Sequence, residues 1–493
     1  MTLRIHRADR TDVLADGLAD LLSSPLADPF AEEVVVVPAR GVERWLTQRL
    51  SQRLGVGPRG GDGVCAGVRF LTPHSLVAML LGKDRDDPWH PDRLVWPLLE
   101  VIDDSLDEEW CATLAAHLGH GSDPADPAAV LRRDRRYSVA RRLAGLFSSY
   151  AVQRPTLLTD WRNGLDTDGA GGRLDHDLLW QAELWRALVV RSDTPPPDVR
   201  HAQTLARLRD GLRDSLHDSL HDRGDDLDLP PRLSLFGHTR LPLSEVELLG
   251  ALGELRDVHL WLPQASPALW DALAPTASGP VSRDEDDSAA VAVHPLLASL
   301  GRDARELQRA LGAIETEATL EAPVTASPDT VLGGLQADLR ANLAPIPREA
   351  TAGDDSLQVH ACHGAARQVD VLREVLGGLL DDDPTLEPRD ILVMCPDIET
   401  YAPLIQAGFG LGEVAGGGSQ GHPAHQLRVR LADRALSSTN PLLAVAGRLV
   451  EMAGGRVSAT EVLDLLSSAA VRARFDLEED ELAQIAMWVD QAG

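Results

Sequence analysis

Four arginines occupy positions where a phosphate group could be bound. Arg40 and Arg44 follow a short apolar segment at 34–37, and Arg154 and Arg367 also lie near predicted strand ends or helix starts. A guanidinium is a planar fork of N–H donors that matches the oxygens of a phosphate. We therefore treat these arginines as candidate nucleic-acid contacts. The alternative for each is a surface arginine paired with one of the many acids of the chain.

The sequence VHACHGAARQ holds a cluster of metal-ligand residue types, His360, Cys362 and His363. Zinc sites usually take two such pairs separated by a loop, and no second pair lies near this one. Adjacent side chains on an extended segment would also point to opposite faces. We expect no metal here and interpret His363 as part of a strand-end turn or a DNA-contact loop. His74 and His238 are isolated, which favours hydrogen-bonded loop histidines.

The residues that phosphoryl transfer needs are missing. Lys83 is the only lysine, and it follows a helical pattern and precedes Asp84, where a phosphate-binding GxxxxGK[ST] loop would require a hydroxyl. The predicted strand at 233–236 continues as FGHTRLP and lacks an acidic pair for magnesium. Ser148 has no nearby base that would make it a nucleophile. We expect no catalytic site and no bound cofactor in this chain.

Composition limits the class of protein. A net charge of −29 and a pI near 4.9 argue against binding nucleic acid over the whole surface, although a local basic channel stays possible. No run approaches the ~18 apolar residues of a membrane span, and the N-terminus lacks a signal-peptide core. The four cysteines show no paired spacing. These features predict a cytoplasmic protein with reduced thiols.

A strand–turn–helix unit must position the first two arginines. Residues 34–37 are four consecutive valines, which predict a strand buried on both faces. Apolar residues then recur every three or four positions from 42 to 54, which predicts an amphipathic helix with Trp45 on its core side. Ligands of parallel sheets collect at the carboxyl ends of strands, where Arg40 and Arg44 lie. Further strands are predicted at 3–6, 68–71, 233–236 and 258–262.

The pattern changes along the chain and predicts three domains. Only helical stripes occur between residues 84 and 228, which indicates a helical insertion in an α/β domain. Residues 264–292 are predicted to form a disordered loop, and 313–355 a linker with a short helix at 331–342. A second α/β domain should contain strands at 357–360 and 391–394. The predicted domains are 1–82 together with 229–345, the insertion 83–228, and 346–493.

Several segments, in order, resemble the RecC subunits (gamma chains) of the RecBCD helicase-nuclease, also called exodeoxyribonuclease V. They include DPFAEEVVVVPARGVERWLTQRLSQRLG, LFSSYAVQRP, LFGHTRLPLSEVELLGALGELRDVHLWL and VHACHGAARQVDVLREVLGGLLDDDPTLEPRDILVMCPDIETYAPLIQAGFG. The resemblance implies an inactive superfamily 1 helicase-like architecture, with two RecA-like parallel-sheet domains and a helical insertion in the first. The family's strand-splitting pin and nuclease-like domain would lie beyond Gly493, so we expect the chain to continue.

The resemblance also implies a function. The expected role is a non-catalytic partner of RecB and RecD that takes double-stranded DNA ends and guides the 3′ strand during double-strand break repair, while the partners bind ATP and magnesium. The family's channel, which in some members scans for the sequence Chi, corresponds to Pro38, Arg40, Arg44, Thr72, Ala78 and Ser148. Phosphate contacts need only charge, so guiding should persist, whereas base readout depends on particular side chains and recognition of the same Chi is in doubt.

Two alternatives stay open. An active ATP-dependent helicase or AddB-like helicase-nuclease subunit would unwind DNA by itself with ATP. A pure assembly scaffold without DNA contact would agree with the acidic charge.

Overall fold

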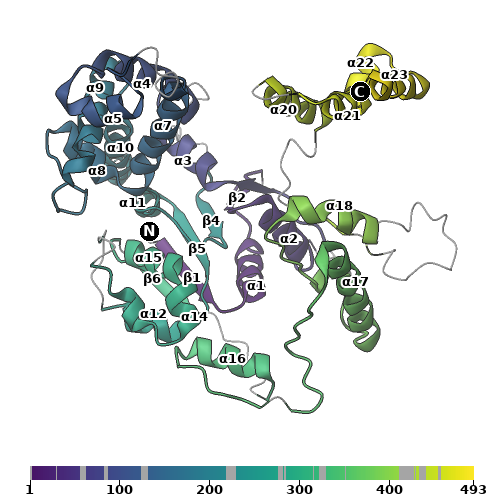
Figure 1. Ribbon diagram of the computed structural model, residues 1–493. Coiled ribbons are helices and arrows are strands. Elements are labelled where there is room, and N and C mark those ends of the chain that lie inside the picture. Colours follow the sequence, from purple (N-terminus) through teal and green to yellow (C-terminus); the bar gives the residue numbers. More distant parts are fainter. Residues whose placement is uncertain are drawn as a thin grey trace. The chain divides into compact units, whose positions relative to one another are not determined.

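A computed structural model gives the fold of the chain (Figure 1). The described residues are 3–28, 30–55, 63–82, 87–123, 131–217, 229–275, 281, 285–314, 316–320, 329–349, 351–409, 427, 429–431, 440–453 and 457–492. They form two compact units, Met1–Leu357 and Gln358–Gly493. Lys83 and Asp84 lie outside the described residues.

Six parallel strands form the centre of the first unit, in the order β3-β2-β4-β5-β1-β6. They are β1 (Leu3–Ala8), β2 (Glu33–Val36), β3 (Val68–Leu71), β4 (Arg232–Phe236), β5 (Asp257–Pro263) and β6 (Thr316–Leu320). The α/β prediction is confirmed, and each of the five predicted strands of this domain is present. The sequence does not predict β6, whose TEATL is poor in strand-forming residues. It forms because β1 offers an open edge, with Ile5 paired to Ala318.

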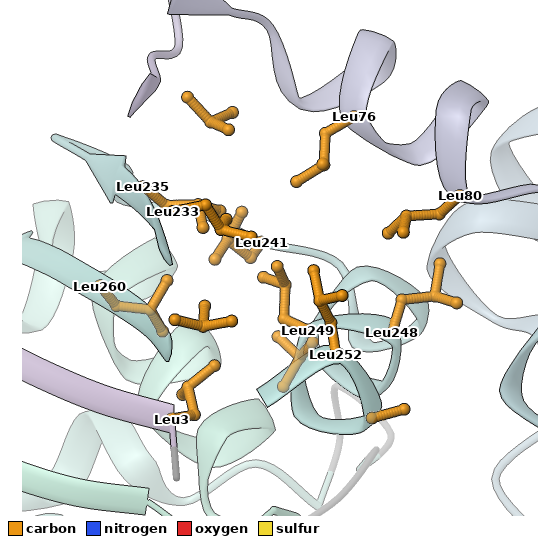
Figure 2. Close-up of a cluster of buried hydrophobic side chains, with 14 of the residues drawn as sticks. Leu3, Leu76, Leu80, Leu233, Leu235, Leu241, Leu248, Leu249, Leu252 and Leu260 are labelled. Carbon is orange, nitrogen blue, oxygen red and sulfur yellow. The ribbon is translucent and has the colours of Figure 1, made fainter. Parts of the chain in front are cut away.

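Alternate residues of β2 enter two different cores, as expected for a strand buried on both faces. Val34 and Val36 belong to the cluster shown in part in Figure 2, where the leucines of α3 (Pro73–Leu81) and α11 (Leu243–Leu255) meet the sheet. Val35 belongs to a second cluster, which α1 (Thr11–Leu22) and α2 (Arg40–Ser51) cover. Trp45 packs against this second cluster with its ring 6.2 Å from that of Phe236, which confirms its predicted core position.

The insertion between α3 and β4 is helical and has a core of its own. Its main helices are α4 (Pro91–Ser105), α5 (Ala112–His117), α7 (Arg136–Gln153), α8 (Pro155–Arg162), α9 (Leu179–Arg191) and α10 (Pro197–His217). Phe147, Trp161 and Trp185 are buried at its centre. Both indoles are satisfied, since Trp161 donates to Thr167 O at 3.0 Å and Trp185 donates to Leu158 O at 3.2 Å. Buried tryptophans with bonded N–H groups favour one rigid packing of these helices.

The disordered loop predicted at 264–292 is only partly irregular. Helix α12 (Pro267–Leu273) begins there, because the Ser266 hydroxyl caps it and Leu269 and Leu273 are buried. Helix α13 (Ser288–Val291) follows. Two further helices, α14 (Pro295–Leu300) and α15 (Arg302–Leu311), meet at Gly301. The short helix predicted at 331–342 is confirmed as α16 (Val331–Arg340).

The second unit is helical in its described part. It contains α17 (Gly364–Asp382), α18 (Ile398–Phe409), α20 (Pro441–Ala453), α21 (Ala459–Ser467), α22 (Ala469–Phe475) and α23 (Glu479–Ala492). The strands predicted at 357–360 and 391–394 are wrong for this structure. Both segments have strand-like residues, yet Val359 and Leu392 are exposed and no described neighbour pairs with them. A strand needs a ladder partner, and apolar composition alone does not provide one.

Among the described residues, no helix combines the length and apolar composition that crossing a membrane requires.

Candidate nucleic-acid interface

Four arginines, three in helix α2 and one just after its end, fall into two groups: two are bound to acids and two pair with no described acid. Arg49 donates two hydrogen bonds to Asp16, at 3.0 and 2.9 Å, and Arg53 lies 3.0 Å from the same carboxylate. Arg40 and Arg44, one turn apart at the start of the helix, are exposed and form no ion pair with any described residue. Their charge is therefore available to an anion, and the helix N-terminus beside them adds partial positive charge.

Register brings three predicted contacts to one edge of the sheet. Val36 is paired with Leu71 in the parallel ladder of β2 and β3, so both strands end at the same level. Pro38 and Arg40 follow the first of these strands, and Thr72 follows the second. All three lie exposed on the carboxyl edge, where ligands of parallel sheets bind.

Thr72 also has a structural role at this edge. Its hydroxyl caps helix α3 by accepting a hydrogen bond from the backbone N–H of Ser75 at 3.2 Å. The same hydroxyl lies 2.9 Å from the Ser75 hydroxyl. Contact of Thr72 with a ligand stays a prediction, as does that of half-buried Ala78 in the same helix.

Arg240, which the sequence alone did not single out, is a third exposed cation near this edge. It lies in the loop that leaves the carboxyl end of β4, is exposed, and forms no ion pair in the part of the chain that the structure describes. The loop starts at Gly237, where an added Cβ would lie 3.7 Å from Val42 Cγ1 of helix α2. Arg240 therefore belongs to the same neighbourhood as the start of α2. The signal that could have found it is its position after a predicted strand, the signal used for Arg40.

His238, next in this loop, differs from its prediction. Its side chain is 3% exposed, and neither ring nitrogen has a hydrogen-bond partner in the structure. Burial lowers the pKa of the imidazole to about 4, so the ring is neutral near pH 7. The predicted hydrogen-bonded loop histidine is wrong, because the ring is buried and both of its nitrogens lack a described partner.

Ser148 and Arg154 lie at the end of helix α7, which is tied to the sheet domain. The Ser244 hydroxyl at the start of α11 donates to the backbone carbonyl of Val152 at 2.7 Å. Helix α11 follows the loop from β4, so this bond holds the end of α7 near the carboxyl edge. Ser148 is half-buried, while Arg154 is exposed and has no ion pair within the described ranges.

Glu245, in the first turn of α11, is an unusual acid at this junction. Burial raises the pKa of its carboxyl group to about 7. No salt bridge with a described residue compensates that burial. At neutral pH the group is therefore partly protonated.

The carboxyl end of β1 is occupied by paired side chains. Asp9 pairs with Arg340 of α16, and its side chain is only 7% exposed. Arg10 binds Asp12, which lowers the pKa of that carboxyl group through their hydrogen bond. The turn contains no glycine that would let backbone N–H groups approach a nucleotide phosphate.

His363 and Arg367 lie in the second unit, at the start of α17. Both are exposed, and Arg367 lies 4.0 Å from Asp370 one turn later. Cys362 Sγ donates a hydrogen bond to the His360 carbonyl at 3.8 Å. The described residues contain no group of three or more His, Cys, Asp or Glu arranged to hold a metal.

Comparisons with known proteins identify the family of the chain. The family model described as RecC, N-terminal domain, matches residues 3–342, and the one described as RecBCD enzyme subunit RecC fourth domain matches 439–493. Over its whole length the chain is 58% identical to RecC subunits of the RecBCD enzyme from Mycobacterium tuberculosis and Mycolicibacterium smegmatis, and it spans 43% of each. It is 27% identical to that of Escherichia coli and spans 45% of it. The chain thus covers less than half the length of these relatives, and it belongs to the RecC family.

Proposed function

We propose that the chain guides DNA as a non-catalytic part of a RecBCD-type helicase-nuclease that repairs double-strand breaks by homologous recombination. In this role it assembles with RecB and RecD, receives double-stranded DNA ends and channels the 3′ strand. ATP and magnesium are bound by the partner subunits. The relatives are RecC subunits of the RecBCD enzyme, which supports membership of such a complex.

The observation that carries the proposal is the placement of unpaired arginines in an acidic chain. The net charge is −29, and many arginines of the first unit are bound to acids, as Arg49 is to Asp16. The exposed arginines without such partners include Arg40, Arg44 and Arg240, which follow neighbouring strands at the carboxyl edge. Free cations on one edge of an otherwise acidic protein favour a local track for a phosphate backbone.

The end of β1 supports a non-catalytic role. A phosphate loop would have to follow this strand, where Asp9 and Arg340 form a pair and glycine is missing. ATP hydrolysis by the isolated chain would instead support the alternative of an active helicase or AddB-like subunit.

The test compares two double variants in and just after helix α2. Arg40→Gln/Arg44→Gln removes the unpaired charges, and the matched control Arg49→Gln/Arg53→Gln removes two charges that are already bound to acids. We expect the first variant to bind a 3′-tailed DNA duplex more weakly in fluorescence anisotropy. Its slope of log affinity against log salt should fall by about 1.4, as for two lost contacts to a single strand. Equal binding by both variants would favour a scaffold without DNA contact.

Scanning for a Chi-like sequence is a finer proposal for the same edge. Pro38, Thr72 and Ser148 carry little charge, so they could read base edges but would not add general affinity. In an assembled complex that contains this chain, 3′-strand cut positions should cluster after one short sequence. Substitution of Thr72 or Ser148 by Val should disperse the cuts, whereas a wild-type map without clusters would show that no such sequence is read.

A further inference from the structure

The start of helix α7 and the residues before it form a strongly basic stretch in an acidic chain. Residues 131–154 contain seven arginines and one aspartate, a net charge of +6, whereas the whole chain carries −29. Positive charge concentrated in one segment is the electrostatic footprint of binding to an anionic polymer. Arg154, at the far end of this segment, lies near the carboxyl edge of the sheet with Arg40, Arg44 and Arg240, which we call the strand-edge site. Most of the charge of the segment lies in residues 132–142.

Two aromatic side chains are exposed beside this charge. Trp96 of helix α4 and Tyr137 of helix α7 are 59% and 48% exposed, and their ring centroids lie 5.8 Å apart at 46°. Trp185 in the same insertion is only 1% exposed, which contrasts with the exposure of Trp96. A hollow of about 520 Å³ adjoins Trp96 and is also lined by Pro88, Arg93 and Pro97. Exposed rings beside a hollow can stack on planar groups.

The arginines beside the rings differ in their partners. Arg136 donates to Asp103 of helix α4 at 2.8 Å. Arg141 and Arg142, in contrast, are exposed and have no ion pair with any residue that the structure describes. Arg141 follows Tyr137 by four residues, so the two side chains share one face of the helix. An aromatic pair and an unpaired cation thus occur on one surface.

We propose that this surface binds single-stranded nucleic acid, with bases stacked on Trp96 and Tyr137 and phosphates bound by Arg141 and Arg142. A single strand is favoured over a duplex because only unpaired bases present free faces for stacking. The surface is separate from the strand-edge site, since Tyr137 and Arg154 lie seventeen residues apart on one helix, about 25 Å at ~1.5 Å per residue. The proposal therefore does not rest on the function proposed above.

A protein partner is the competing occupant. Trp, Tyr and Arg are also common anchors of protein interfaces. Such an interface would require an acidic partner surface to match Arg141 and Arg142, whereas a sugar-phosphate backbone supplies that charge along its whole length. The exposed charges of Arg141 and Arg142, which no described acid pairs, favour the polyanion.

The test uses the 493-residue chain and a fluorescent oligothymidine of about 20 nucleotides, longer than the ~16-nucleotide upper size of one binding site. Arg141→Gln/Arg142→Gln should lower the salt slope of binding by about 1.4. Trp96→Ala/Tyr137→Ala should weaken binding about fivefold or more with little change in slope, because stacking is uncharged. Trp488→Ala is the matched control, since this tryptophan is also 59% exposed but lies in the second unit.

The outcomes separate the explanations. Unchanged affinity and slope in both test variants would overturn the proposal. It would also be overturned if DNA binding stayed intact while Trp96→Ala prevented co-purification with a partner subunit, which would identify a protein interface. If Arg141→Gln/Arg142→Gln weakens binding but Arg40→Gln/Arg44→Gln does not, the strand-edge function fails and this surface stands. Photocrosslinking of an iodouracil oligonucleotide to the peptides that contain Trp96 or Tyr137 gives a readout independent of affinity.

Discussion

Ser244 and Val152 join the helical insertion to the sheet domain, through a 2.7 Å hydrogen bond from the Ser244 hydroxyl to the Val152 carbonyl. The bond satisfies a carbonyl in the last turn of α7, where intrahelical donors run out. We expect Ser244→Ala to lower the free energy of unfolding by about 1 kcal/mol. Hydrogen exchange should also become faster at the backbone around Arg154.

Ser149→Ala is a suitable control for this prediction, because Ser149 lies exposed on the same helix. Equal urea midpoints for both variants would mean that the bond does not hold the two parts together.

Glu245 should make stability depend on pH. Its folded pKa of about 7 lies above the ordinary value of 4.5, so the folded state keeps a proton that the unfolded state loses. Stability is therefore present below pH 4.5 and is lost as pH rises through 7, by about 3 kcal/mol at most. Glu245→Gln should raise the urea midpoint at pH 8 and leave it nearly unchanged at pH 4.5.

Glu254→Gln is the matched control for Glu245, since it makes the same exchange at an exposed position of helix α11. If the urea midpoint at pH 8 rises equally in Glu245→Gln and Glu254→Gln, burial of Glu245 is not the cause of the rise.

Much of the sheet domain can be predicted from the sequence, because neighbouring residues along the chain determine its strands and helices. Four consecutive valines predict a strand buried on both faces, and the spacing after them predicts α2 with Trp45 toward the core. Strand β6 does not follow, since its residues are held by the edge of β1 rather than by their own preference. The segments around Val359 and Leu392 show the opposite case. Their residues favour a strand, but no described strand lies beside them to pair with, so they form none.

The site was predictable in part for the same reason. Arg40 follows its strand directly, so its position at the carboxyl edge could be read from the sequence. Its lack of an acidic partner could not, because Asp16 selects Arg49 and Arg53 through the packing of α1 on α2. Charge pairing depends on which helices pack together, and residues next to each other in the sequence do not determine that packing.

His238 should make the protein sensitive to acid. Burial lowers its pKa to about 4, so the unfolded state, with an ordinary value of 6.5, takes up a proton first as pH falls. Stability present above pH 6.5 is lost between 6.5 and 4, by about 3 kcal/mol at most. His238→Leu should remove that loss and should not destabilise the protein at pH 7, because the ring has no hydrogen-bond partner in the structure.

His74→Leu repeats the exchange of His238 at an exposed position and should leave the acid profile unchanged. Some acid sensitivity should persist in His238→Leu, since burial also lowers the pKa of His259 to about 4. Superimposable profiles of urea midpoint against pH for wild type and His238→Leu would contradict the assignment.

Gly237 sets the direction of the loop that carries Arg240. Its φ is +76°, a left-handed conformation that costs an L-residue about 1–2 kcal/mol. An added Cβ would meet Val42 Cγ1 at 3.7 Å, an ordinary contact, so the backbone alone should account for the penalty. Gly237→Ala should therefore destabilise the protein by about 1 kcal/mol and weaken DNA binding no more than Arg240→Gln does.

Gly145→Ala, inside helix α7 with no atom within 4 Å of the new Cβ, should instead stabilise the protein by about 0.5–1 kcal/mol. Unfolding temperatures that fall in Gly237→Ala and rise in Gly145→Ala would isolate the backbone effect. Changes of the same sign would show that the left-handed conformation is not needed at the end of β4.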